Sequence, residues 1–311
     1  MRDITIVIPF FKLKYFDATL ASLANQSNHD FKVIIGNDCS PEDPLPLIDQ
    51  YRSILDIDYV RFENNLGGTD LTQQWSRCVD RVNTEWFVIL GDDDLYSEEV
   101  VAGFYDTLTQ LKSTVLRLKS QLINDRSEAT SQIFDFAYLP DVNDFQYQNL
   151  QGKARCSLSE YIFRTEDYRL MGIDSYEKAF YSDNMMIHKY SRFGMIQDID
   201  KGFAKVRLSE DSLSGNEKNS GALLRAKIHF YKDLVLKYAA HLKQEYIVMY
   251  FNVLFETMYT LDPSSKLKYS AYKILKAEVV GNKLLNGLLA KGYRKFLEIQ
   301  MKTRLKQFLK R

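Results

Sequence analysis

The chain has 311 residues, of which 45% are hydrophobic, so it is long enough for one large core and an extension. Basic and acidic residues balance at 41 each, and no recognised nucleic-acid motif accompanies the basic ones. The longest apolar stretch, 246–255, is shorter than the roughly 20 residues of a membrane span. We expect no signal peptide before the first strand, and three cysteines without metal-type spacing indicate free thiols in the cytoplasm.

Strands and helices alternate over the first eighty residues. Apolar segments predict strands at 5–11, 31–35 and 59–62. A helix that places Phe16, Leu20 and Leu23 on one face follows the first strand, and further helices are predicted near 45–55 and around Trp75. This order predicts a doubly wound, mostly parallel α/β sheet with helices on both faces.

Three consecutive carboxylates, Asp92, Asp93 and Asp94, follow the apolar segment 86–90. That segment is typical of a buried parallel strand, and ligands bind at the carboxyl ends of such strands. Adjacent anions repel one another unless a cation offsets their charge. Carboxylate oxygens suit Mg²⁺ or Mn²⁺, which in turn favour phosphate oxygens. The alternative is a solvated acidic turn in which Asp94 caps a helix at 97–108.

The middle of the chain predicts a strand at 115–123, a loop at 135–151 and a short helix at 158–163. A further helix begins near Asp183 and extends to Lys189. Taken alone, Asp183 could serve only as the cap of that helix.

The last part of the chain is strongly basic. From Ser264 onward, thirteen lysines and arginines stand against two glutamates, which gives this segment a charge of +11. Apolar residues recur there at helical spacing: Tyr272, Leu275 and Val279, then Tyr293, Leu297, Met301 and Leu305. Such a basic amphipathic segment can lie on an anionic membrane surface. The alternative is a pair of helices that pack their apolar faces on the α/β domain and leave the lysines in solvent.

The ordered motifs of residues 3–215 resemble those of the inverting family 2 glycosyltransferases, which have the GT-A fold. The matches are the Ile6-Val7-Ile8-Pro9 strand, Ser22-Leu23 with Gln26, the turn at 37–43, Asn65-x-Gly67 and Gly91-Asp92-Asp93-Asp94. Later matches are Ser182-Asp183, in the form of an acidic pair common in one subfamily, and Val206-Arg207.

The resemblance implies a role for each matched residue. Asp38 is expected at the nucleotide base, Asp92 near the ribose, and Asp93 with Asp94 on a Mn²⁺ or Mg²⁺ ion. The other expected contacts to the nucleotide sugar are Pro9, Phe11, Asn65, Gly67 and Arg207. Asp183 corresponds to the general base, and Arg207 to a contact with the diphosphate.

Two departures from the family pattern affect these roles. Gly91 replaces the usual first aspartate of the Asp-x-Asp-Asp motif, which leaves open whether Asp93 or Asp94 is the closer metal ligand. Ser209 stands where many relatives have a histidine, so we expect no imidazole in the metal shell.

The predicted protein is therefore an inverting glycosyltransferase of the bacterial surface-polysaccharide type. Its catalytic domain covers 1–215, with a nucleotide-binding half at 1–110 and an acceptor-binding half at 111–215, and a basic helical extension covers 216–311. The donor is expected to be a nucleotide-diphosphate sugar, with uridine diphosphate favoured by family frequency. The acceptor is expected to be a lipid-linked saccharide, used by a peripheral enzyme on the inner face of the cytoplasmic membrane.

Two other functions remain open from the sequence. A nucleotidyltransferase or sugar-phosphate pyrophosphorylase also has carboxylates at strand ends, but it would normally carry a glycine-rich basic loop after the first strand. Here Pro9-Phe10-Phe11 occupies that position. A carbohydrate-binding protein without catalysis is the second, and the retained Asp38, Asp92–Asp94 and Asp183 argue against it.

Overall fold

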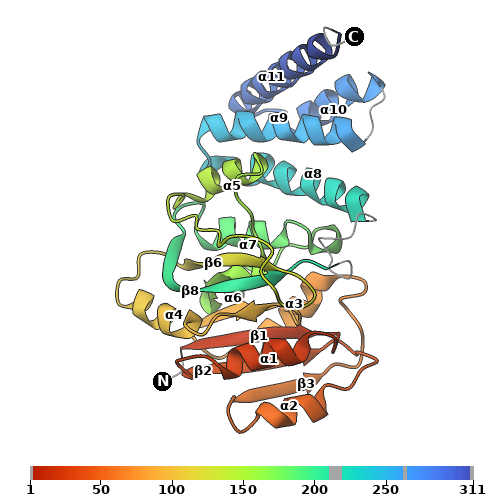
Figure 1. Cartoon of the computed structure of the whole chain (residues 1–311). Helices are drawn as coiled ribbons and strands as arrows, with labels where there is room; N and C mark the ends of the chain where they lie inside the picture. The colour runs from red at the N-terminus through yellow and green to blue at the C-terminus, as the bar shows by residue number, and fades with distance from the viewer. Residues whose placement is uncertain (1–2, 210–218, 262–264, 309–311) are drawn as a thin grey trace. The chain divides into compact units, whose positions relative to one another are not determined.

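The computed structural model describes residues 3–209, 219–261 and 265–308 (Figure 1). These residues belong to two compact units. The first comprises 1–175 and 182–216, and the second comprises 176–181 and 217–311. The predicted domain boundary at 215–216 lies outside the described residues.

The first unit is built on one sheet of eight strands in the order β3-β2-β1-β4-β7-β6-β8-β5. The strands are β1 Ile4–Phe10, β2 Phe31–Asn37, β3 Ile57–Arg61, β4 Trp86–Ile89, β5 Leu95–Tyr96, β6 Val115–Ile123, β7 Tyr161–Arg164 and β8 Gln197–Arg207. Strands β3, β2, β1 and β4 are parallel, and β7 is antiparallel to both β4 and β6. Because β6 and β8 are parallel, the carboxyl ends of β1, β2, β4, β6 and β8 meet at one edge. The predicted mixed, mostly parallel sheet is confirmed.

Helices cover both faces of this sheet, as predicted (Figure 1). They are α1 Phe16–Ala24, α2 Leu45–Tyr51, α3 Leu71–Val79, α4 Val100–Leu108, α5 Val142–Leu150, α6 Thr165–Met171 and α7 Ser182–Tyr190. Side chains of β1 alternate between two cores: Ile6 packs with α1, α2 and α4, whereas Val7 packs with α3, α6 and α7. This alternation follows from the two-residue period of a strand.

Two predicted segments differ in the structure. The predicted loop at 135–151 contains helix α5, because Asp141 caps its first turn by accepting hydrogen bonds from the backbone N–H of Asn143 and Asp144. The predicted helix at 158–163 is only a 3₁₀ turn at Leu158–Glu160. Tyr161 then begins strand β7, whose buried side chains fill the space between β4 and β6.

The second unit is helical, as predicted, with α8 Ser220–Leu236, α9 Gln244–Leu261, α10 Ser265–Glu278 and α11 Lys283–Phe308. Much of the predicted apolar face of α10 and α11 is turned inward. Leu275 and Val279 are buried, and the rings of Tyr272 and Tyr293 stack 4.7 Å apart beside Phe255 of α9. None of the described helices is both long and apolar enough to cross a bilayer.

Candidate active site

The three consecutive aspartates lie where the sequence predicts them, in the turn between β4 and β5 at the carboxyl edge of the sheet. They are not the cap of a helix, because α4 begins only at Val100. Each of the three carboxylates has different hydrogen-bond partners, and each therefore has a different role in the site.

Asp92 fixes the loop that follows β1. Its Oδ2 atom accepts hydrogen bonds from the backbone N–H of Phe11 (2.7 Å) and of Lys12 (2.9 Å). Burial, followed by the neighbouring charge of Asp93, raises the pKa of Asp92 to about 6. Asp92 therefore holds the loop of Phe11 against the acidic turn.

Asp94 is buried and its two oxygens are both engaged. The backbone N–H of Arg207 donates to Oδ1 at 2.8 Å, and the hydroxyl of Ser159 donates to Oδ2 at 2.5 Å. Burial and the charge of Asp93 raise the pKa of Asp94 to about 7. Its contacts join three segments that are far apart in sequence.

Asp93 is the carboxylate best placed to bind a cation. In the part of the chain that the structure describes, it accepts no hydrogen bond from another side chain. Burial raises its pKa, and the positive charges of Arg207 and Lys12 oppose that rise. No group of three or more His, Cys, Asp or Glu within 3–209, 219–261 and 265–308 is arranged to hold a metal ion. Mg²⁺, however, commonly binds through one or two carboxylates plus substrate phosphates, and Asp93 fits that mode.

Arg207 lies at the same edge of the sheet, and its guanidinium hydrogen-bonds to the acidic turn and to the loop after β6. Its Nε donates to the carbonyl of Asp93 (2.9 Å) and its Nη2 to the hydroxyl of Ser127 (2.9 Å). Nη1 donates to the carbonyl of Asn124, and the group lies 4.1 Å over the ring of Tyr15. Each guanidinium nitrogen thus has one protein partner, which uses three of the five N–H donors and leaves the second N–H of Nη1 and of Nη2 for the predicted contact with a diphosphate.

Asp38 lies at the end of β2, next to the loop that follows β1. Its carboxylate accepts hydrogen bonds from the backbone N–H of Leu66 and Gly67, each at 2.8 Å, and pairs with Arg77. The guanidinium of Arg77 also lies 3.9 Å over the ring of Phe62. Three of the roughly four acceptor positions of the carboxylate are therefore filled, and one remains.

Four other residues predicted around the nucleotide, Pro9, Phe11, Asn65 and Gly67, belong to the two segments that contact Asp38. The backbone N–H of Asp38 donates to the carbonyl of Phe10, and the carbonyl of Phe11 accepts from the hydroxyl of Ser40. Asn65 orders the loop of Gly67 through a bond from the N–H of Gly68 at 2.6 Å. Pro9 is the penultimate residue of β1, directly before this corner.

Asp183 stands in the first turn of α7, as predicted. Its Oδ1 accepts from the backbone N–H of Asn184 at 2.8 Å, and the thiol of Cys156 donates to its Oδ2 at 3.8 Å. Burial raises its pKa above the ordinary range of an aspartate. A carboxylate with a raised pKa is a better proton acceptor for a hydroxyl group.

One short segment connects the acidic turn to Asp183. Ser159 binds Asp94, and Cys156, three residues earlier, contacts Asp183. The two contacts come from positions three residues apart, which are at most about 11 Å from each other along the chain, so one short segment contacts both carboxylates. Tyr96 donates to the carbonyl of Ser159 at 2.9 Å and fixes this segment on the sheet.

A buried ion pair supports the same segment. Glu160 pairs with Arg155, which also donates to the hydroxyl of Ser120 at 2.8 Å. Burial raises the pKa of Glu160 to about 7, against the lowering effect of Arg155. Sequence reasoning missed Arg77, Cys156, Ser159 and this pair, because each acts through contacts between distant segments.

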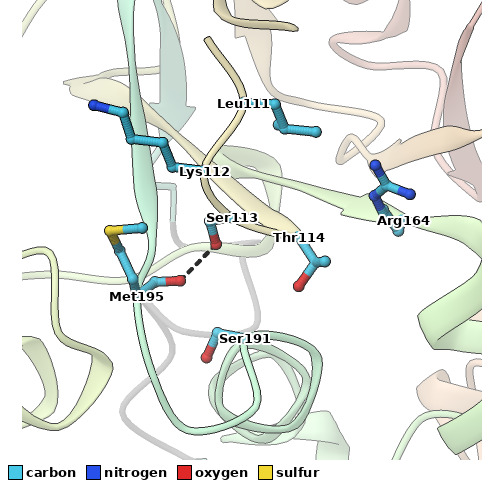
Figure 2. A pocket seen from close by; sticks show the side chains of 7 residues that line it. All are labelled: Leu111, Lys112, Ser113, Thr114, Arg164, Ser191 and Met195. Carbon is cyan, nitrogen blue, oxygen red and sulfur yellow. Dashed lines mark hydrogen bonds between the residues drawn. The ribbon is translucent and has the colours of Figure 1, made fainter.

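A cavity of about 320 Å³ lies at the opposite edge of the sheet (Figure 2). It is lined by Arg164, which pairs with the first residue of β4, and by hydroxyl residues around the end of α7. There Thr114 donates to the carbonyl of Tyr190 (2.6 Å) and Ser113 to that of Met195 (2.5 Å). These hydroxyls secure the far end of the helix that carries Asp183.

A second recess, of about 560 Å³, lies at the carboxyl ends of β6 and β8. Its lining is polar apart from one leucine: Asn124, Asp125, Arg126, Glu128, Leu208 and Ser209. Arg207 ties its loop to the acidic turn. Size and lining are both compatible with a saccharide.

Replacing Asp94 by asparagine should raise the melting temperature in the presence of EDTA. An ionised carboxylate is penalised in this buried position, so its folded-state pKa of about 7 lies above the unfolded value of 3.8. The cost of burying the ionised Asp94 is absent below its pKa in the unfolded state, because the carboxyl is then neutral in both states. It is complete above its pKa in the folded state, where the carboxylate is ionised in both. We expect a rise of a few degrees at pH 8, which disappears near pH 4. Calorimetric melting at both pH values tests this, and a lower melting temperature at pH 8 would contradict it.

Comparison with known proteins agrees with this geometry. The family model "Glycosyl transferase family 2" matches residues 5–162, just over half of the chain. The poly(ribitol-phosphate) beta-N-acetylglucosaminyltransferase TarS of Staphylococcus aureus is 24% identical over 140 residues, covering 44% of this chain and 24% of TarS. Chondroitin synthase of Pasteurella multocida is 42% identical over 60 residues, 19% of this chain and 6% of that protein.

The crystal structure of S. aureus TarS 1–349 in complex with UDP-GlcNAc has the same fold, with a TM-score of 0.68 and 15% identity. The match covers 98% of this chain and 92% of that one. The aligned segment is only about a quarter of the full length of TarS, and the structural match with the longer TarS crystal structure covers 55% of that chain. The match of the family model, together with the GT-A fold of the sheet, shows that the chain belongs to glycosyl transferase family 2.

Proposed function

We propose that this protein is an inverting glycosyltransferase that moves a sugar from a nucleotide-diphosphate sugar to a hydroxyl group of a saccharide acceptor. One observation carries the proposal: in a family 2 chain, the acidic turn and Asp183 contact the same short segment. Family membership also favours this function over the nucleotidyltransferase or pyrophosphorylase that the sequence left open.

The residues of the site divide the reaction between them. Asp93, with Asp94 behind it, would hold Mn²⁺ or Mg²⁺, which as a Lewis acid stabilises negative charge on a leaving diphosphate. Asp92 keeps the backbone of Phe11 at the donor edge. Asp183 takes the proton of the attacking hydroxyl, and Cys156 orients its carboxylate. A single displacement with one base inverts the configuration at the anomeric carbon.

Transfer assays in Mn²⁺ with a panel of nucleotide sugars test the proposal. UDP-GlcNAc comes first, because TarS is crystallised with it. The acceptors are poly(ribitol phosphate), chondroitin and hyaluronan oligosaccharides, and proton NMR gives the product configuration. A retained configuration would refute the single displacement. In a parallel assay with a sugar phosphate and a nucleoside triphosphate, formation of a nucleotide sugar with release of pyrophosphate would establish a pyrophosphorylase. Binding without any turnover would establish a non-catalytic protein.

The site should prefer uridine to cytidine nucleotides. The N3–H of uracil can donate to the remaining acceptor position of Asp38, whereas N3 of cytosine is itself an acceptor and would face the carboxylate. We expect about 10- to 100-fold tighter binding of UDP than of CDP, the scale for one unsatisfied polar contact. Titration calorimetry in Mn²⁺ measures both. An Asp38→Asn variant should narrow the difference, and equal binding by the wild type would contradict the assignment.

The acceptor proposed here is a lipid-linked saccharide of a surface polysaccharide, used at the inner face of the cytoplasmic membrane. Two observations support it. Similar proteins are named for polymer substrates or products, and the segment from Ser264 onward carries a charge of +11. The polar recess beside Arg207 is the place proposed for the acceptor saccharide.

A further inference from the structure

We propose that the second unit contacts an anionic lipid surface through one defined site, the turn between α10 and α11. This α10–α11 tip consists of Ile274, Val280 and Leu284 together with Lys273, Lys276 and Lys283. The inference deepens the proposed function and rests on its lipid-linked acceptor.

The tip exposes three aliphatic side chains to solvent. Val280 is 77% exposed, Leu284 is 55% exposed and Ile274 is 51% exposed. Their neighbours Val279 and Leu285 are buried in the core of the same unit. The exposure therefore alternates with burial along an ordered turn, and it leaves three aliphatic side chains in water within eleven residues.

The conformation of the turn is fixed by specific contacts. Gly281 has a φ of +85°, which favours glycine, and Asn282 accepts a hydrogen bond from the backbone N–H of Leu285 at 3.0 Å. The side chain of Asn286 donates to the carbonyl of Val279 at 3.0 Å. These bonds hold Val280 at the apex, so no refolding is needed before it contacts a partner.

The charges around the tip decide which partner it fits. Lys273, Lys276 and Lys283 are exposed, and the acidic Glu278 is paired with Lys232 at 2.8 Å. Protein interfaces are enriched in aromatic residues and arginine and depleted in lysine. Aliphatic residues flanked by lysines are instead typical of segments that insert shallowly into anionic bilayers.

The site differs from attachment through the whole basic tail. On the predicted apolar faces of α10 and α11, Tyr272 and Tyr293 pack against Phe255 of α9, and Leu275 and Val279 are buried. These parts of the faces are not available to lipid, whereas Met301 is 69% exposed. Other exposed lysines, such as Lys291, Lys295 and Lys302, lie farther along α11, away from the three aliphatic residues. If binding is localised at the tip, removing three lysines there should weaken it more than removing three lysines farther along α11. If binding is spread over the whole basic surface, the two changes should weaken it equally.

The test is cosedimentation of the full chain with vesicles of phosphatidylcholine mixed with phosphatidylglycerol. One triple variant carries Lys273→Gln, Lys276→Gln and Lys283→Gln, and the matched control carries Lys291→Gln, Lys295→Gln and Lys302→Gln. At about fivefold for each lysine near the surface, the tip variant should lose about 10²-fold in partitioning, and the control far less. Equal losses would overturn the tip in favour of a diffuse basic surface.

The apolar contribution has its own pair of variants. Val280→Ser with Leu284→Ser should reduce partitioning at least about tenfold, whereas Ile299→Ser with Met301→Ser, also exposed on α11, should leave it nearly unchanged. Circular dichroism checks that each variant is folded. Failure of the wild type to bind these vesicles, or binding that survives the tip double variant, would overturn the proposal.

The same preparations separate this inference from the proposed function. Transfer to a soluble acceptor is measured beside vesicle binding, and the tip variants should retain it. If the protein transfers no sugar but its vesicle binding depends on the tip, the proposed membrane site stands and the proposed glycosyltransferase activity is refuted. If the protein transfers sugar but its vesicle binding is unchanged in the tip variants, the glycosyltransferase activity stands and the proposed membrane site is refuted.

Discussion

An Asp183→Asn variant should bind its donor normally and lose at least about 10²-fold, and up to about 10⁴-fold, in the rate of transfer. Asparagine keeps the shape of the side chain and can still accept the hydrogen bond from the N–H of Asn184. It cannot take a proton from the attacking hydroxyl. Rapid-quench measurement of transfer, with calorimetry of UDP binding, separates the two effects.

The control for Asp183 is Asp144→Asn, which makes the same change in the first turn of α5. It should leave turnover unchanged. The pKa of Asp183 is raised by burial, so the acid limb of the kcat profile should lie above the ordinary aspartate range. Normal turnover by the Asp183→Asn variant would show that Asp183 is not the general base and serves only at the start of α7.

Replacing Asp93 by alanine should reduce turnover at least about 10²-fold, the scale for losing one preorganised electrostatic stabiliser. Within the described residues, the carboxylate of Asp93 accepts no hydrogen bond from another side chain. Its removal therefore takes away the proposed metal ligand and leaves the hydrogen bonds of Asp92 and Asp94 in place. The variant should also lose the dependence of UDP affinity on Mn²⁺. Manganese EPR and calorimetry measure this directly.

The matched control is Glu98→Ala, which removes an exposed carboxylate five residues farther along. Its metal dependence should equal that of the wild type. Full activity of Asp93→Ala, or of the wild type in EDTA, would show that the acidic turn does not bind a metal. The two aspartate variants thus differ in their readouts: Asp183→Asn keeps metal-dependent donor binding, and Asp93→Ala loses it.

The parts of the fold that are visible in the sequence are those set by local periodicity. The apolar segment at 115–123 is a strand with the same bounds in the structure, and Phe16, Leu20 and Leu23 are buried on one face of α1. The position of the acidic turn followed from the rule that strand ends carry ligands. Local patterns were therefore sufficient for the donor half of the sheet.

The connection between the acidic turn and Asp183 could not be predicted in this way. Ser159 lies 65 residues from Asp94, and Cys156 lies 27 residues from Asp183, so neither contact leaves a local pattern. Strand β7 is short and antiparallel and follows a 3₁₀ turn, which made its first residues resemble a helix. The tertiary pairing with β4 and β6 decides its conformation.

Gly91 leaves room for the side chains of the acidic turn, which matters for engineering this site. A Cβ atom at this position would lie 2.9 Å from Oδ1 of Asp93 and 3.2 Å from Oδ2 of Asp94. The N–H of Gly91 also donates to Ser159, whose hydroxyl holds Asp94. An aspartate at position 91 would add a fourth carboxylate beside this pair. Any side chain at this position requires the carboxylate of Asp93, the proposed metal ligand, to turn away from its present place.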